Sequence, residues 1–325
     1  MRKWITFVSL LVLTSALLTA CGSSNSNKPL TKVSQIVGWT PQPESGGQYA
    51  ALMKGFYQEA GLDMTIEPGG PQITPSQLVA SGKIPFGMAK GDDLLLARQE
   101  GLPLVAIAGI FQKTPQALMF HKGEPIKDFK DLNGRKVYTS PGVVYWEYIK
   151  KAYKLDKVED LVYNGQLATF SADKTSVSQV FGTNEPFYVK QQGVDIDLLW
   201  VADSGYSPYD NILITTEQYI KDHPDIVKAY VEASIKGWNY YKDNYEEVNP
   251  FIKEKNKELN TEAMAYASKT MKDLVYGGDA ATKGVGYMST ERWEALMKQM
   301  IDLKTLKQEQ DLSKVFTTKY LPAPK

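Results

Sequence analysis

The chain has one cysteine and two histidines among its 325 residues. Because Cys21 is the only cysteine, the chain can form no internal disulfide and no thiolate metal site. We expect His121 and His223 to be exposed surface residues. The chain also lacks a nucleophile elbow, a phosphate-binding loop and a metal-binding helix motif. These absences predict that the protein has no catalytic residue, no cofactor and no metal site.

The chain has no excess of charge of either sign, with 37 basic and 37 acidic residues. Proteins that bind nucleic acid need a strongly basic surface, so nucleic acid is not an expected partner. A carboxylate pair such as Asp92 and Glu185 is the arrangement that a glycosidase uses. Nothing else in the sequence supports that chemistry.

The first residues carry the pattern of an export signal. Arg2 and Lys3 precede an apolar run over residues 4–20, which is shorter than the roughly 20 residues of a membrane span. Cys21 follows a small-residue cleavage pattern and is followed by a polar run, as in bacterial lipoprotein signals. We predict a signal peptide over residues 1–20, lipidation at Cys21 and a flexible tether over residues 21–32. The lipid anchor alone would then hold the protein on the extracytoplasmic face of the cell membrane.

Strand-like and helix-like segments alternate through two stretches of the body, residues 33–110 and 135–215. Alternation with short links predicts an α/β protein with mostly parallel sheets flanked by helices. We predict one lobe over residues 33–118 plus 216–325 and a second over residues 119–215, in a monomeric protein. The expected crossings between the lobes lie near residues 118–122 and 212–216, and such a body would hinge about them.

The helical patterns within this frame give more local expectations. Apolar spacing predicts one helix over residues 48–60 and another over residues 174–180. After residue 216 the pattern is helical to the end of the chain, over residues 224–244, 246–257, 261–274 and 289–303.

Ligands of open parallel sheets collect where the carboxyl ends of strands lead into helices. The loops at these positions are rich in aromatic, glycine and short polar residues, which suits stacking on a ring and hydrogen bonding to its edge. The candidate ligand-binding residues are Trp39, Gln42, Gly46, Gly47, Tyr49, Asp92, Gln112, Tyr145, Asn184, Glu185 and Tyr206.

Several of these residues also fit a purely structural role. Trp39, at the end of a strand, fits the core as well as a ligand surface. Asp92 fits the cap of its helix. Glu185, next to Pro186, fits an acid in the first turn that complements the helix dipole.

Specific stretches of the chain resemble one family. They are GWTP at residues 38–41, YAALMKGFYQEAGLD at 49–63, PGG at 68–70, LVASG at 78–82, FG at 86–87, EGLPLVA at 100–106, DLNGRKV at 131–137 and TNEP at 183–186. Together they are similar to the solute-binding proteins of ABC importers, in the branch that includes binders of thiamine-pyrimidine precursors and of alkanesulfonates. The resemblance runs from about residue 38 to residue 243. It implies a two-lobed type II periplasmic-binding fold, a small-molecule ligand, and an ABC permease with its ATPase as partners.

The resemblance also implies roles for two residues, Trp39 as a stacking surface and Glu185 as the acceptor for an amino group. The first loop departs from the family, because Pro41 and Gln42 open a segment without its usual histidine or asparagine. Three ligand classes therefore remain: a thiamine-pyrimidine precursor, a riboflavin-like compound, and an alkanesulfonate or nitrate anion. The acidic residues in these loops would repel an anion. The alternative to a binding protein is an extracytoplasmic enzyme. The fungal relatives that make the pyrimidine carry extra cysteines and histidines, and this chain lacks them.

Overall fold

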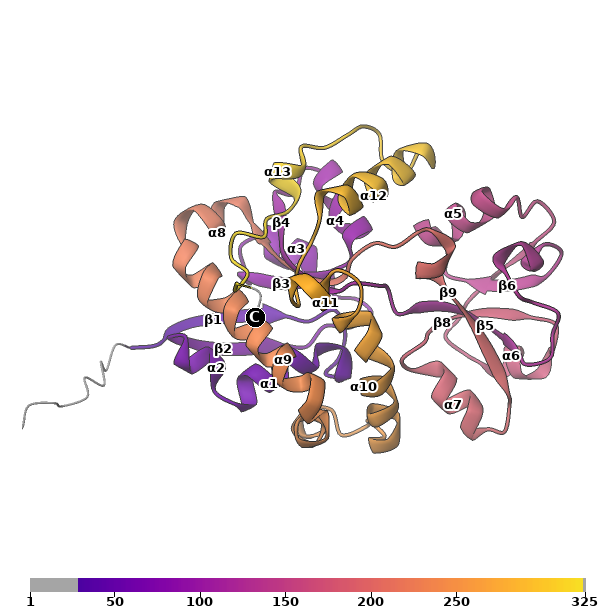
Figure 1. Ribbon diagram of the computed structural model, residues 1–325, viewed down its shortest axis with the longest axis horizontal. Coiled ribbons are helices and arrows are strands. Elements are labelled where there is room, and N and C mark those ends of the chain that lie inside the picture. The colour runs from indigo at the N-terminus through magenta and orange to yellow at the C-terminus, as the bar shows by residue number, and fades with distance from the viewer. Residues whose placement is uncertain (1–28, 324–325) are drawn as a thin grey trace, which may run out of the picture.

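A computed structural model describes residues 29–323 of the chain (Figure 1). The predicted signal peptide, Cys21 and most of the predicted tether lie outside the described residues. Thr31 and Lys32, predicted as the end of the tether, instead belong to the first strand, which pairs with its neighbour from Thr31 onward. No helix within residues 29–323 combines the length and the apolar character needed to cross a membrane.

The strands form two separate five-stranded sheets, one in each lobe (Figure 1). In the first sheet the order is β2-β1-β3-β10-β4, and only β10 runs antiparallel to its neighbours. Its strands are β1 (Thr31–Ile36), β2 (Leu62–Glu67), β3 (Phe86–Ala89), β4 (Leu104–Phe111) and β10 (Asp210–Thr216). The mostly parallel α/β architecture predicted from the alternating pattern is confirmed for this lobe.

The second sheet repeats the same plan with the order β7-β6-β8-β5-β9, where β5 is the antiparallel strand. Its strands are β5 (Gln116–His121), β6 (Lys136–Thr139), β7 (Glu159–Val162), β8 (Val177–Phe181) and β9 (Ile196–Trp200). β8 occupies most of the segment predicted as a helix, and that prediction is wrong. Val177 and Val180 have helical spacing, but the segment is buried between β5 and β6, and pairing on both sides outweighs local preference.

The chain passes between the sheets twice, over residues 112–115 and 201–209. The crossings expected near residues 118–122 and 212–216 fall mostly inside strands β5 and β10 instead. Both strands pair with neighbours on each side, so each continues almost to the crossing itself. The two crossings lie side by side between the lobes in Figure 1.

Helices cover both sheets, and the helical C-terminal third returns to the first lobe, as the sequence predicts (Figure 1). The predicted helix over residues 48–60 is divided at Gly55, whose φ of 73° ends one helix and starts the next. The helices of the first lobe are α1 (Gly46–Met53), α2 (Phe56–Glu59), α3 (Pro75–Ala80), α4 (Gly91–Gln99), α8 (Glu217–Asp222), α9 (Pro224–Lys255), α10 (Thr261–Tyr276), α11 (Ala280–Lys283), α12 (Thr290–Asp302) and α13 (Leu312–Val315). The break predicted after residue 244 appears as a kink at Asn244 inside α9.

The second lobe carries α5 (Val144–Tyr153), α6 (Ala168–Ala172) and α7 (Glu185–Gln191). His121 at the end of β5 is buried, stacks on the ring of Phe170 and bonds through Nε2 to the carbonyl of that residue at 2.9 Å. The expectation that His121 is exposed is therefore wrong, whereas His223 is exposed as expected. His121 fastens α6 to the sheet.

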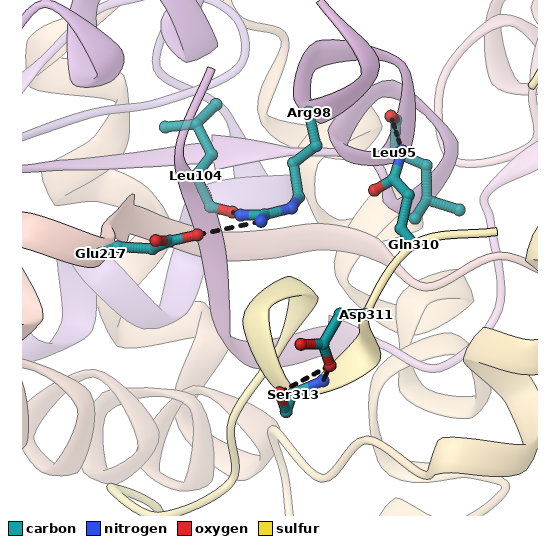
Figure 2. A network of polar contacts seen from close by, with 7 residues as sticks. All are labelled: Leu95, Arg98, Leu104, Glu217, Gln310, Asp311 and Ser313. Carbon is teal, nitrogen blue, oxygen red and sulfur yellow. Dashed lines mark hydrogen bonds and ion pairs between the residues drawn. The ribbon is translucent and has the colours of Figure 1, made fainter. Parts of the chain in front are cut away.

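Figure 2 shows how α4 is fixed within the first lobe. Arg98 donates to the carbonyl of Leu104 at the start of β4 and pairs with Glu217 at the start of α8, with 2.9 Å between nitrogen and oxygen. The side chain of Gln310 donates to the carbonyl of Leu95, and Asp311 caps the short helix α13. These bonds tie α4 to the sheet and to the C-terminal segment, and α4 begins at the cleft described next.

The cleft between the two lobes as candidate functional site

A cleft of about 880 Å³ lies between the lobes and is lined by both of them. The first lobe contributes residues that follow β1 and β3, the second contributes residues that follow β7 and β8, and the start of β10 forms the base. The ends of β1, β3, β7 and β8 are carboxyl ends of parallel strands, which is where the strand-end rule predicts a ligand site, whereas β10 is antiparallel and contributes its amino end.

Large apolar side chains are exposed inside the cleft. Trp39 is 46% exposed, Ile73 40% and Phe181 38%, and all three line the cavity. An indole packed in a core would be fully covered, so the structure decides against the core reading of Trp39. Trp39 and Phe181 come from different lobes and offer aromatic surface to a flat ligand.

Glu44, in the short helical turn η1 (Pro43–Ser45), brings a buried carboxylate to the first-lobe wall. Burial raises the pKa of Glu44, the hydroxyl of Thr183 lowers it in part, and the charge of Glu185 raises it further. Asn211 holds the backbone of this turn, because its side-chain amide donates to the Glu44 carbonyl at 2.9 Å. Asn211 has a φ of 44°, a left-handed conformation that is strained for a non-glycine residue and common at functional sites.

Glu185 opens α7 in the second lobe and faces the same cavity. Its Oε2 accepts from the backbone N–H of Phe181 at 2.8 Å, and Oε1 lies 3.5 Å from the hydroxyl of Tyr163. Burial raises the pKa of Glu185, although these bonds lower it in part. Burial and the nearby Glu185 charge raise the pKa of Tyr163 to about 12, which keeps the phenol protonated as a donor. The bond to Phe181 also fits the first-turn role considered for Glu185.

A second charged group surrounds Lys90 at the base of the cleft. Burial lowers the pKa of Lys90, but the charges of Asp210, Asp93 and Asp92 outweigh it and leave the pKa raised. Asp210 accepts from the hydroxyl of Thr114 at 2.8 Å, and burial raises its pKa. Asp93 opens onto the cleft, yet the surrounding protein and the charge of Asp92 raise its pKa to about 6. Lys90 is thus held charged by carboxylates of its own lobe.

A helix of the first lobe also contacts the loop that precedes α7. This loop carries residues that the second lobe contributes to the site. The hydroxyl of Tyr266 in α10 donates to the carbonyl of Gly182 at 2.9 Å, and its ring lies 5.8 Å from that of Phe187 in α7. Asn184 and Glu185 lie between these two contacts in the chain. The position of Glu185 therefore depends on how α10 and α7 meet.

Of the residues predicted from the sequence, Trp39, Gln42, Asn184 and Glu185 line the cleft. Gly46 and Gly47 do not, because α9 covers them. A Cβ added at Gly46 would lie 2.3 Å from the ring of Tyr241, and one at Gly47 would lie 2.2 Å from the ring of Trp238. These two glycines let α1 approach α9 closely.

The other five predicted residues also lie outside the cleft lining. Tyr49 is in the core beside Phe251. The carboxylate of Asp92 accepts from the hydroxyl of Tyr206 at 2.9 Å, so each of these two is buried against the other. Their bond ties α4 to the second crossing.

Gln112 and Tyr145 make polar contacts within the protein. Gln112, in the first crossing, donates to the carbonyls of Gly109 in β4 and of Tyr287 between α11 and α12. The hydroxyl of Tyr145 donates to Gln179, which itself lines the cleft, at 3.1 Å. Tyr145 therefore supports the wall from behind.

The cleft lining also contains ionisable residues that are not among the ligand-binding residues predicted from the sequence: Glu44, Lys90, Asp93, Glu100, Tyr163 and Asp210. Lys90 and Asp93 lie in a loop at the end of a predicted strand. The residue of this loop predicted to bind the ligand is Asp92, next to Asp93. Adjacent residues of a helix point about 100° apart, so only one of the two faces the cleft. Within the described part of the chain, no cluster of histidine, cysteine and acidic residues has the geometry of a metal site.

Comparisons with known proteins place the chain in a family. The family described as "NMT1/THI5 like" matches residues 42–248. A formylaminopyrimidine-binding protein of Halalkalibacterium halodurans is 27% identical over 73% of this chain and 75% of its own length. The riboflavin-binding protein RibY of Chloroflexus aurantiacus is 22% identical over 94% and 90%.

Two further similarities bear on fold and chemistry. The yeast 4-amino-5-hydroxymethyl-2-methylpyrimidine phosphate synthase THI12 is 32% identical, but over only 33% of this chain and 32% of its own length. The structure of the periplasmic aliphatic sulphonate binding protein SsuA of Escherichia coli superposes with a TM-score of 0.67 at 13% identity, covering 90% of this chain and 94% of that one. The fold is thus the two-lobed periplasmic-binding fold. The resemblance that the sequence motifs carry is confirmed, and the chain belongs to the NMT1/THI5-like family.

Proposed function

We propose that this protein is the solute-binding component of an ABC importer. It takes a small planar heteroaromatic nutrient, such as a thiamine-pyrimidine precursor, between its lobes and delivers it to a membrane permease and its ATPase. The observation that carries the proposal is the cleft itself, where exposed aromatic rings of both lobes lie beside buried carboxylates. Stacking would supply affinity, and hydrogen bonds to the ring edge would supply specificity.

The relatives support this class of ligand. Two of them are named for binding formylaminopyrimidine and riboflavin, both of which are flat heteroaromatic compounds with polar edges. A riboflavin-like compound is the first alternative, and the cleft volume of about 880 Å³ leaves room for more than one ring. An alkanesulfonate or nitrate anion is the second. Lys90 is the only basic residue among the described residues that line the cleft. The acidic residues of the lining count against an anion: Glu44, Asp93, Glu100, Asp210 and Glu185.

The signal-like N-terminus motivates the rest of the proposal. We propose that the protein works as a monomer on the extracytoplasmic face of the cell membrane, held there by lipid on Cys21. Mass spectrometry of protein from its native membrane would test this part, with a diacylglyceryl group on Cys21 as the expected result. A mature chain that begins elsewhere would overturn it.

An enzyme is the competing class, because the yeast relatives are named synthases. The described residues that line the cleft include no histidine and no cysteine, and the described part of the chain has no metal-binding cluster. We therefore propose binding without chemical change.

A ligand screen tests the function. The mature protein is heated with 4-amino-5-hydroxymethyl-2-methylpyrimidine, formylaminopyrimidine, thiamine, riboflavin or butanesulfonate, and any compound that raises the melting temperature is titrated by calorimetry. A ligand at about 100 times its Kd should stabilise the fold by about 2.7 kcal/mol. Recovery of the unchanged compound by chromatography would support a binder. A response to butanesulfonate alone, or conversion of the compound, would overturn the proposal.

A further inference from the structure

Two groups of carboxylates lie in or next to the cleft, and they differ in whether a basic residue lies among them. Asp92, Asp93 and Asp210 surround Lys90, so the first group contains its own cation. Asp210 is further satisfied by Thr114 and by the backbone N–H of Asn211. Lys90 therefore offsets part of the negative charge of this group without any ligand.

The second group is Glu44 from the first lobe and Glu185 from the second. Neither carboxylate forms an ion pair within residues 29–323. The polar groups beside them are the hydroxyls of Thr183 and Tyr163 and backbone N–H groups, among them that of Phe181. None of these groups is basic. Glu44 and Glu185 are therefore two like charges without an ion-pair partner among the described residues, whereas Lys90, which also lines the cleft, lies among the carboxylates of the first group.

Such a pair is unfavourable when it is removed from water, because each carboxylate loses hydration and repels the other. A cation placed between them would be attracted by both and would relieve both penalties. Since each lobe supplies one carboxylate, the same cation would also link the lobes. The face of Trp39 nearby suits a positive charge as well, because the face of an aromatic ring is electron-rich. The ring of Phe181 already has the ammonium of Lys90 5.9 Å from its centre.

We propose that Glu44 and Glu185 are the specificity-determining residues of the cleft and that they select a ligand with a positive charge on its ring edge. The inference rests on the proposed binding function and narrows its ligand class from planar heteroaromatics to cationic ones. A neutral analogue of the same shape fits the aromatic walls but leaves the two carboxylates without a partner. An anionic analogue is rejected.

Two pyrimidines that differ in one group test the selection. In 4-amino-5-aminomethyl-2-methylpyrimidine the side arm is an ammonium at pH 7.5, whereas in the 5-hydroxymethyl compound it is a neutral hydroxyl of nearly the same size. Calorimetric titration of the mature protein with each compound in low salt gives two values of Kd. We expect the ammonium compound to bind at least tenfold more tightly, and we expect added salt to reduce the difference.

Three variants locate the origin of the preference. Glu44→Gln and Glu185→Gln keep the shape of each side chain and remove its charge, and each should reduce the preference about tenfold. Glu254→Gln removes an exposed charge on α9 outside the cleft lining and should leave the preference unchanged. Having two cleft variants keeps the test decisive if one of them folds poorly, which the melting temperature without ligand reports.

The outcomes separate this inference from the proposed function. Equal binding of both compounds, or a preference that survives both cleft variants, overturns charge selection and leaves the binding function intact. If neither pyrimidine binds, both the charge selection among pyrimidines and the proposed ligand class are overturned.

Discussion

Arg292 of α12 joins the two crossings between the lobes. Its Nη2 donates to the carbonyl of Gln112 in the first crossing at 2.6 Å and to that of Ser207 in the second at 3.0 Å. Its Nη1 lies 3.3 Å from the side-chain oxygen of Gln112, and the guanidinium lies 3.8 Å from the ring centre of Tyr209. One side chain therefore holds both hinge segments at a fixed separation.

We predict that Arg292→Ala lowers the free energy of unfolding by about 3–5 kcal/mol. A hydrogen bond from a charged donor contributes about 1.5–3 kcal/mol, and two short ones are lost together with the stacking on Tyr209. Arg292→Lys keeps the charge, but an ammonium lacks the fork that reaches both carbonyls. We expect Arg292→Lys to lower the free energy of unfolding by about half as much as Arg292→Ala.

Equilibrium urea unfolding, followed by circular dichroism and by tryptophan fluorescence, measures the change. A second measurement asks whether the hinge itself has changed. Spin labels at Lys83→Cys and Lys157→Cys, one exposed position in each lobe, report the distance between the lobes once Cys21 is replaced. We expect a broader distance distribution in Arg292→Ala than in the parent. A loss below 1 kcal/mol with an unchanged distribution would refute the reasoning.

Three further variants test other parts of the molecule. Gly47→Ala should lower stability by at least about 3 kcal/mol in thermal unfolding, since its Cβ would lie 2.2 Å from the Trp238 ring; a neutral effect would show that α1 can move. Trp39→Ala should weaken ligand binding by about 1–2 kcal/mol in calorimetry with little change in stability, whereas Tyr188→Ala, an exposed aromatic outside the cleft lining, should change neither. Burial raises the pKa of Asp93 to about 6 in the folded protein from its ordinary value of 3.8, so the folded state binds the proton more tightly and stability falls as pH rises from about 4 to 6. Because Asp93 opens onto water, we expect about 1 kcal/mol, and urea unfolding of Asp93→Asn should lack that part of the pH dependence.

The sequence predicts the fold well where the signal is local. Alternating segments with short links gave two mostly parallel α/β lobes, and the break near residue 244 appears as the kink at Asn244. Prediction failed at β8, where Val177 and Val180 match a helix and only pairing with two other strands reveals the extended form. It also failed at the crossings, because strand pairing determines how far β5 and β10 continue.

The site was predictable to the level of loops and not of side chains. Strand-end loops include Trp39 and Glu185, which line the cleft. Gly46 and Gly47 lie in the same loop, but their role depends on Tyr241 and Trp238, which come from a helix about 190 residues later. Such non-local packing leaves no mark on the local pattern.

The hinge and the carboxylate pair together bear on how an importer distinguishes loaded from empty protein. Arg292 holds both crossings, so the lobes are expected to move as rigid bodies about a short, well-defined hinge. Closing an empty cleft would bring Glu44 and Glu185 together without an ion-pair partner among the described residues, and the repulsion of like charges opposes that closure. A ligand cation between them would reverse the sign of the interaction. The closed form would then be populated only with its cargo in place, because a ligand shifts such an equilibrium by its differential affinity for the two states.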